Sequence, residues 1–228
     1  MSGSAGVGRV GGAMSLFYDC TKPAERADAV SAATDAVRRG DLVVLPTDTV
    51  YGVGTDAFIP SAVATLLRAK GRGRDLPVPV LVGSWAALDG LVLHVSQTAR
   101  DLIEAFWPGG LTLVLAHAPS LAWDLGDTRG TVAVRMPLHP VALDLLKQTG
   151  PMAVSSANRS GRPAALDATE AQDQLGEDVA VYLDGGRCAD PVASAIVDLT
   201  APVPRLLRAG AVTTEQLRTV VPDLRTDD

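Results

Sequence analysis

The sequence has few aromatic residues, few cysteines and no long apolar run. Aromatics make up 4% of the 228 residues, so the core must be built mainly from Val, Leu and Ala, as in packed layers of sheet and helix. No apolar run reaches the ~18 residues that a membrane-spanning helix needs. The N-terminus has no charged region followed by an apolar stretch, so nothing resembles a secretory signal. We therefore expect a cytoplasmic protein with no membrane partner.

The sequence also lacks the Cys and His spacing of metal sites and the basic charge of nucleic-acid-binding proteins. Cys20 and Cys188 lie far apart without a CxxC partner, and His94, His117 and His139 show no ligand spacing. We expect neither a structural disulfide nor a metal held by protein side chains. The net charge of −6 argues against a constitutive nucleic-acid surface, but it leaves room for a local basic pocket that holds a phosphate-bearing substrate.

The common nucleotide-binding signatures are absent or lack their context. GxxxxGK[ST] occurs nowhere, which excludes a P-loop. Gly6, Gly8 and Gly11 match GxGxxG, but no strand precedes them and no helix follows, so a dinucleotide fold is not indicated. Residues 1–13 are mostly small, and we expect a flexible tail there, before a single domain over residues 14–228.

Apolar spacing predicts alternating helices and strands along that domain. Helices are predicted at residues 24–39, 60–69, 96–107, 139–148, 168–175 and 213–220. Strands are predicted at residues 42–45, 78–82, 111–115, 131–135, 152–154, 179–183, 195–199 and 205–207. Some strand pairs are joined by connections too short for a helical crossover, so the sheet must be mixed. The alternation predicts a three-layer α/β fold around that sheet.

One segment concentrates positive charge where a phosphate group would need it. Lys70-Gly71-Arg72-Gly73-Arg74 places three cations in five residues at the end of a predicted helix, with glycines that allow a ligand to approach the backbone. Taken alone, such a run more often faces water as a solvated basic loop. Its role therefore depends on what surrounds it.

Polar islands beside apolar strands supply that context. They read PTDTVYG at 46–52, AKGR at 69–72, FWPGGLTL at 106–113, VRMP at 134–137, SSANRSG at 155–161, LDGG at 183–186 and LRAG at 207–210. Each alone fits turn residues or an ordinary salt bridge. In this order they resemble the YrdC-type threonylcarbamoyl-AMP synthases, from about Leu42 to Leu217.

The resemblance implies a YrdC/RibB-like fold, a twisted mixed sheet around a deep cavity. ATP, L-threonine and bicarbonate would give threonylcarbamoyl-AMP and pyrophosphate, with Mg²⁺ brought by ATP and no organic cofactor. A downstream tRNA threonylcarbamoyl transferase would be the partner. By motif, the catalytic residues are Lys70, Arg72, Ser156 and Asn158. ATP would be bound by Lys70, Arg72, Thr131, Asn158 and Arg208, and L-threonine by Thr49, Arg135, Ser156 and Ser194.

Several positions depart from the family's common pattern, among them Gly110 where Pro is usual and Ala195 where Thr is common, and two other functions stay open. Leu81 stands where many members carry a His near the threonine, and Leu76 where a polar residue near ATP is frequent. One alternative is an RNA-binding module of the same fold, which would use the basic loop at 70–74. The other is a carbamoyl-adenylate-forming domain like that of hydrogenase-maturation proteins. Salt-dependent tRNA affinity and the choice between threonine and carbamoyl phosphate would separate the three.

Overall fold

Short apolar runs form the strands of one large sheet in the computed structural model, which describes residues 15–189 and 191–226. The predicted tail at residues 1–13 lies outside this range. Eleven strands join in the order β1-β8-β2-β3-β7-β4-β6-β5-β9-β10-β11. Their bounds are β1 Leu16–Asp19, β2 Val43–Leu45, β3 Gly52–Asp56, β4 Val80–Leu81, β5 Leu111–Ala116, β6 Thr131–Arg135, β7 Met152–Ser156, β8 Val181–Asp184, β9 Ala195–Asp198, β10 Arg205–Arg208 and β11 Arg225–Thr226.

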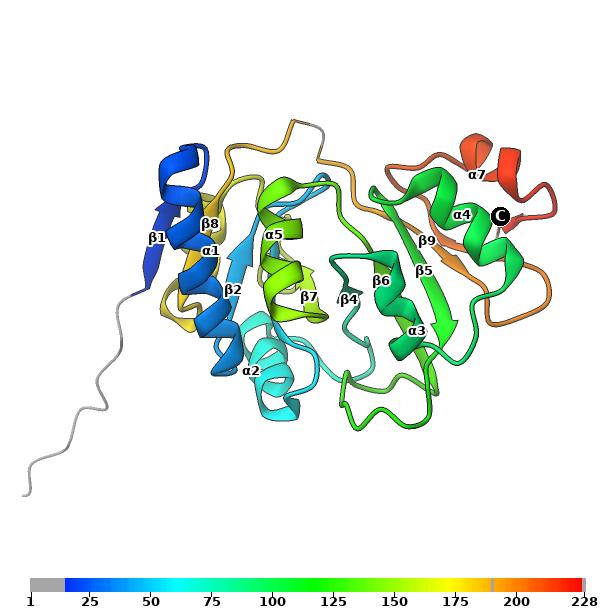
Figure 1. The fold of residues 1–228 in the computed structure, drawn as a ribbon, viewed down its shortest axis with the longest axis horizontal. Coiled ribbons are helices and arrows are strands. Elements are labelled where there is room, and N and C mark those ends of the chain that lie inside the picture. The colour runs from blue at the N-terminus through cyan, green and yellow to red at the C-terminus, as the bar shows by residue number, and fades with distance from the viewer. Residues whose placement is uncertain (1–14, 190, 227–228) are drawn as a thin grey trace, which may run out of the picture.

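The sheet is mixed, as the short connections predict. β2 and β3 form an antiparallel hairpin, and β3 runs antiparallel to β7, whereas β2 pairs with β8 and β4 with β6 in parallel. The sheet twists, so its two ends are seen at different angles in Figure 1. The predicted α/β class with a twisted mixed sheet is confirmed.

Helices cover both faces of the sheet. Their bounds are α1 Pro23–Arg38, α2 Pro60–Lys70, α3 Leu88–Leu91, α4 Gln97–Phe106, α5 Pro140–Thr149, α6 Ala168–Leu175 and α7 Thr214–Val220, with 3₁₀ turns η1 Trp85–Ala87 and η2 Gly176–Asp178. Helices α1 and α5 lie side by side (Figure 1) and share an apolar cluster with β2, β7 and β8. Residues of α2, α4, α6 and α7 belong to the second, larger cluster. Two cores separated by a sheet make the three layers.

Local signals in the sequence set the predicted helix ends. The Ser96 hydroxyl accepts a hydrogen bond from the Ala99 amide, 3.2 Å, which caps α4. Gly40 follows α1 with a φ of +83°, a conformation that side chains with a Cβ rarely adopt. All six predicted helices are present, with ends that differ by a residue or two.

The sequence-based prediction misses strands β1, β3 and β11, and β3 is the one that borders the polar motifs. The stretch from Thr47 to Gly54 reads as a polar loop because glycine has a low preference for strands, yet the strand begins at Gly52. The reason lies in the packing of its neighbour. A Cβ on Gly52 would lie 2.7 Å from Val154 Cγ1, and one on Gly54 would lie 2.7 Å from the carbonyl oxygen of Ala153. The close approach of β7 therefore requires glycine inside this strand.

Candidate active site

The end of α2 brings Lys70 and Arg72 against the segment that follows β7. Lys70 is the last residue of α2. Gly71 follows with a φ of +62° and ends the helix, and Arg72 comes directly after this turn. The Lys70 ammonium donates to the carbonyl oxygen of Ser156 and to that of Asn158, the latter at 2.6 Å. Arg72 donates to the Ser155 hydroxyl, 3.2 Å. We call Lys70, Arg72, Ser155, Ser156 and Asn158 the Lys70 cluster.

Burial makes the cations of this cluster unusual. Lys70 is only 3% exposed, and burial, reinforced by the nearby charge of Arg72, lowers its pKa to about 8. Burial also lowers the pKa of Arg72, and its Nε hydrogen finds no acceptor among the described residues. Neither side chain forms an ion pair within the described part of the chain. A polyanion bound beside them would supply the missing charge.

Arg74, the third cation of the basic segment, does not belong to the cluster. Its guanidinium forms two hydrogen bonds to the Asp124 carboxylate, 2.6 and 2.9 Å, at an exposed position. Of the three cations, only Lys70 and Arg72 are therefore available for a ligand. The segment divides into a buried lysine and a partly buried arginine at the site, and one ordinary surface ion pair.

A second group of polar side chains surrounds Arg135 at the end of β6. The Arg135 guanidinium donates to the Thr49 hydroxyl, 2.8 Å, to the carbonyl oxygen of Gly109, 2.9 Å, and to the Asp48 carboxylate. Burial lowers the Arg135 pKa, and Asp48 opposes that shift. The arrangement holds a buried guanidinium in one orientation and leaves N–H groups for a further acceptor.

Arg208 and Ser194 continue this group. Arg208 donates to the Ser194 carbonyl oxygen, 2.7 Å, and to the Ser194 hydroxyl, 3.0 Å, while Ser194 and Thr112 share a hydroxyl–hydroxyl bond of 2.8 Å. Burial lowers the Arg208 pKa. Arg208 lies close enough to Arg135 to lower the pKa of Arg135 as well. We call Asp48, Thr49, Thr112, Arg135, Ser194 and Arg208 the Arg135 cluster.

One loop joins the two clusters. Residues Pro46–Tyr51, which we call the site loop, connect β2 to β3. Thr49 of this loop bonds to Arg135, and the carbonyl oxygen of Tyr51 accepts the Ala157 amide, 2.7 Å, next to Ser156. Inside the loop, the Thr47 hydroxyl donates to the carbonyl oxygen of Val50, 2.7 Å, and contacts the Thr49 hydroxyl, 3.1 Å. The loop therefore carries hydroxyl groups between the two groups of cations.

Thr131 and Asn158, two of the residues predicted to bind ATP, form hydrogen bonds with backbone carbonyl oxygens close to them in the chain. Thr131 begins β6, whose other end is Arg135, and its hydroxyl donates to the carbonyl oxygen of Thr128, 2.8 Å. Five strand residues separate the two ends by roughly 13 Å. The Asn158 amide donates to the carbonyl oxygens of Arg159 and Arg162, at 3.0 and 2.8 Å, which holds the turn beyond β7. Their contact with a nucleotide stays a prediction.

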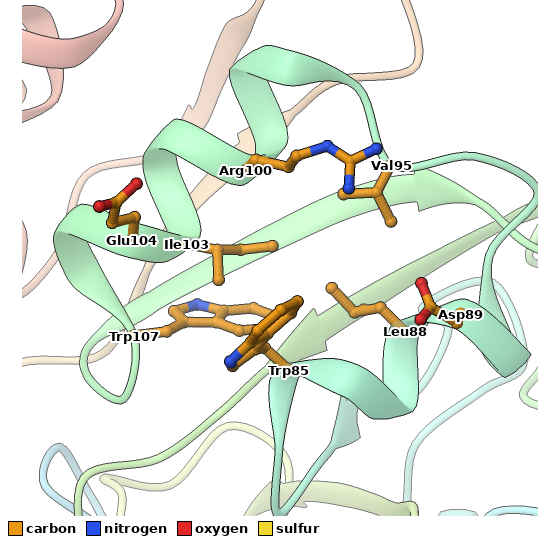
Figure 2. A pocket seen from close by; sticks show the side chains of 8 residues that line it. All are labelled: Trp85, Leu88, Asp89, Val95, Arg100, Ile103, Glu104 and Trp107. Carbon is orange, nitrogen blue, oxygen red and sulfur yellow. The ribbon is translucent and has the colours of Figure 1, made fainter.

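Two cavities among the described residues lie away from these clusters. One, of about 350 Å³, is lined by side chains from η1, α3 and α4, with Trp85 and Trp107 on one wall (Figure 2). The other, of about 380 Å³, lies between α1 and α5, near Arg26 and Asp144. Neither is lined by the Lys70 or Arg135 cluster, so the deep cavity around these clusters stays a prediction.

The sequence matches the Sua5, YciO and YrdC family, described as telomere recombination, over residues 35–210. This is most of the chain. The chain belongs to the Sua5–YciO–YrdC family.

Individual relatives agree with this membership. A Mycobacterium tuberculosis protein provisionally named threonylcarbamoyl-AMP synthase is 58% identical over 208 residues, 91% of this chain and 96% of the relative. The Bacillus subtilis threonylcarbamoyl-AMP synthase is 36% identical over 215 residues, but the match covers 62% of its length. The Pyrococcus abyssi Sua5 structure in complex with L-threonine has a TM-score of 0.84 at 34% identity, covering 94% of this chain and 62% of that one. These relatives place the chain in an enzyme family.

Several residues of this Sua5–YciO–YrdC site were not singled out from the sequence. Asp48 and Thr112 belong to the Arg135 cluster, and Ser155 belongs to the Lys70 cluster. All three stand inside the motifs PTDTVYG, FWPGGLTL and SSANRSG. The signal was present, but a motif does not say which of its polar side chains faces a partner.

Two of the departures from the family pattern, Leu81 and Leu76, differ in their surroundings. Leu81 is buried in the apolar cluster that α1 and α5 cover, together with Met152 and Leu145. Leu76 is 54% exposed. Leu81 is accommodated as a core residue at the end of β4, where its neighbours are apolar.

Proposed function

We propose that this chain is a threonylcarbamoyl-AMP synthase, a nucleotidyltransferase that converts ATP, L-threonine and bicarbonate into threonylcarbamoyl-AMP and pyrophosphate. The observation that carries the proposal is a set of three cations, Lys70, Arg72 and Arg208, none of which forms an ion pair within residues 15–189 and 191–226. Lys70 is buried, Arg72 is partly buried, and burial lowers the pKa of all three side chains. An anionic ligand would supply the counter-charge that these desolvated cations lack. The names of the relatives agree with a triphosphate and threonine as the substrates.

The proposed reaction requires the protein to position the reactants and to stabilise negative charge. Threonine and bicarbonate condense to a carbamate with loss of water, and a carbamate oxygen attacks the α-phosphorus of ATP. The bond from that phosphorus to the bridging oxygen breaks, and pyrophosphate leaves. Negative charge grows on the leaving oxygens, where Lys70 and Arg72 would meet it. No protein nucleophile is needed for this sequence of steps.

The Arg135 cluster fits the amino-acid substrate. A guanidinium held by Asp48, Thr49 and Gly109 keeps N–H donors for a carboxylate, which is the group that arginine binds best. Ser194 and Thr49 add hydroxyl groups that can exchange hydrogen bonds with the threonine side chain. The two clusters would then hold the two reactants on either side of the site loop.

Magnesium fits this site as a companion of the nucleotide. Within the part of the chain that the structure describes, no group of three His, Cys, Asp or Glu side chains could hold a metal ion. The donors near the proposed phosphates are cations and hydroxyls, which suits an ion carried by phosphate oxygens. We propose a cytoplasmic protein whose product passes to a tRNA threonylcarbamoyl transferase. No helix among the described residues is long and apolar enough to cross a membrane.

The test is pyrophosphate release with ATP, bicarbonate and one amino acid at a time. Threonine should support release and an adenylate product, and serine, which lacks one methyl group, should do so more weakly. Valine should be the poorest substrate, because a pocket that hydrogen-bonds a hydroxyl rejects an isostere that lacks it. Release that needs no amino acid, or that prefers carbamoyl phosphate, would contradict the proposal.

Arg135→Ala tests the amino-acid pocket within the same assay. It should raise the KM for threonine at least tenfold, since it removes the carboxylate partner. The matched control is Arg39→Ala, which removes an exposed arginine paired with Asp41 and should leave threonine use unchanged. Equal threonine use by both variants would show that Arg135 does not bind the amino acid.

A further inference from the structure

The Leu183–Gly186 segment is the one family motif to which the proposed chemistry assigns no residue. We propose that it is a positioning clamp, in which Asp184 and Gly185 hold the site loop through Tyr51 and thereby place Thr49 in the threonine pocket. The kinetic consequence rests on the proposed function. The clamp itself is a structural claim and is tested separately below.

The first part of the clamp is a buried hydroxyl junction. Tyr51 is fully buried, and its hydroxyl oxygen lies within donating distance of two acceptors, the Gly186 carbonyl oxygen at 2.6 Å and the Asp184 carboxylate at 3.0 Å. The same hydroxyl oxygen accepts the Gly185 amide, 2.9 Å. Burial raises the Tyr51 pKa, so the hydroxyl stays a donor at any physiological pH. One side chain of the site loop therefore meets three consecutive residues of the motif.

The second part is a backbone contact that requires glycine. A Cβ on Gly185 would lie 2.7 Å from Pro46 Cγ and 2.9 Å from His139 Cε1, so the start of the site loop rests directly on this residue. Gly186 has a φ of +86°, and its amide donates to the Asp184 carboxylate, 2.9 Å. Asp184 Oδ1 therefore accepts two hydrogen bonds, one from the Gly186 amide of its own motif and one from the Tyr51 hydroxyl of the site loop.

The clamp grips the loop at both ends and leaves its middle for the substrate. Pro46 at the start rests on Gly185, and Tyr51 at the end is held by Asp184. Between them lies Thr49, which bonds to Arg135, and Asp48, which pairs with the same guanidinium. Neither Tyr51 nor Asp184 is among the residues predicted to bind ATP or threonine. We therefore assign them an indirect role, in which they fix the position of Thr49. A hydroxyl displaced by about 1 Å loses its hydrogen-bond geometry.

Tyr51→Phe tests the clamp against a closely matched control. Tyr182 is also fully buried, and its hydroxyl donates to the Gly176 carbonyl oxygen, 2.7 Å, away from the site loop. Tyr51→Phe and Tyr182→Phe each remove one buried tyrosine hydroxyl, so both melting temperatures should fall, and Tyr51→Phe should fall further because it leaves three partners unsatisfied instead of one. Hydrogen exchange in peptides that cover residues 46–52 should accelerate in Tyr51→Phe alone.

The kinetic readout separates positioning from folding. Tyr51→Phe should raise the KM for threonine at least fivefold and leave the affinity for ATP within twofold, while Tyr182→Phe changes neither. Asp184→Asn keeps an acceptor oxygen and should stay near wild type, whereas Asp184→Ala should match Tyr51→Phe. Gly185→Ala should also raise the KM for threonine.

The outcomes distinguish the clamp from the proposed function. Unchanged loop exchange in Tyr51→Phe overturns the clamp, whatever the enzyme does. Faster exchange with an unchanged KM for threonine overturns the positioning role. A wild-type protein that releases no pyrophosphate overturns the proposed function, and hydrogen exchange at residues 46–52 still decides the clamp.

Discussion

The positive charges of Lys70 and Arg72 are partly desolvated. Burial lowers the pKa of both side chains, and the two charges also repel each other. Their hydrogen bonds go to carbonyl and hydroxyl oxygens, which orient the cations without neutralising them. At the scale of single residues, the site is therefore prepared for an anion and is electrostatically costly without one.

Arg72→Ala should separate catalysis from folding when it is compared with Arg74→Ala. Loss of one electrostatic donor at a phosphoryl-transfer site typically lowers the rate by on the order of a hundredfold, so Arg72→Ala should reduce pyrophosphate release by about that factor. Arg74 has an exposed ion pair with Asp124, and its loss should change the rate less than about threefold. Similar rates for the two variants would make the whole 70–74 segment a solvated loop.

The Lys70 pKa of about 8 predicts how ATP binding depends on pH. The neutral amine increases as pH rises through 8, and a neutral amine attracts phosphate weakly, so ATP affinity should fall between pH 7 and 9. Binding should take up a proton near pH 8, which calorimetry in buffers of different ionisation enthalpy measures. ATP affinity that is flat across this range would contradict the assignment.

The lowered Lys70 pKa also predicts how the stability of the ligand-free protein changes with pH. The folded pKa is depressed below the unfolded value of 10.5, so between about pH 8 and 10.5 the unfolded chain binds more protons at this residue. The contribution of Lys70 to unfolding free energy should therefore rise with pH across that window. Lys70→Met should remove this slope.

At the scale of elements, the site depends on strands that approach unusually closely. Strand β3 contains Gly52 and Gly54 because Val154 and the backbone of β7 occupy the space where their side chains would lie. This approach brings Tyr51 and Ser156 next to each other, since Gly52 pairs with Ser156 in the ladder. The β3–β7 pairing thus brings the site loop to the Lys70 cluster.

Gly54→Ala should destabilise the protein, while Gly90→Ala should not. A Cβ at position 54 would lie 2.6 Å from Val154 Cγ2, and such overpacking costs about 1–3 kcal/mol. A Cβ at Gly90 in α3 would meet no neighbouring atom within 4 Å, and the backbone there is helical, so alanine should add about 0.5–1 kcal/mol to the unfolding free energy. Denaturant unfolding of both variants measures the difference. Equal stabilities would show that β3 and β7 can separate freely.

At the scale of the whole molecule, the net charge and the charge of the two site clusters have opposite signs. The net charge is −6, yet four of the cations, Lys70, Arg72, Arg135 and Arg208, belong to the two site clusters. A surface with excess negative charge repels the phosphate backbone of RNA, and a small cluster of cations around the site attracts a compact polyanion. This distribution favours a nucleotide ligand over an RNA-binding module.

Titration of tRNA without ATP tests that distinction. Binding at near-physiological salt should be weaker than about 100 μM, the weak end of ordinary non-specific affinity. Affinity in the low micromolar range that falls steeply between 50 and 200 mM salt would support the RNA-binding alternative. Competition by ATP in the same titration would show whether any RNA that binds uses the Lys70 cluster.

The α/β class, the six longer helices and the order of the polar motifs can all be predicted from the sequence. These features follow from local spacing and capping groups such as Ser96, which act over a few residues. Three other features require the folded chain: Gly52–Asp56 is a strand, Arg74 pairs with Asp124, and Asp184 accepts a hydrogen bond from Tyr51. Those outcomes depend on partners 50 to 133 positions away along the chain, and contacts at that separation leave no local pattern.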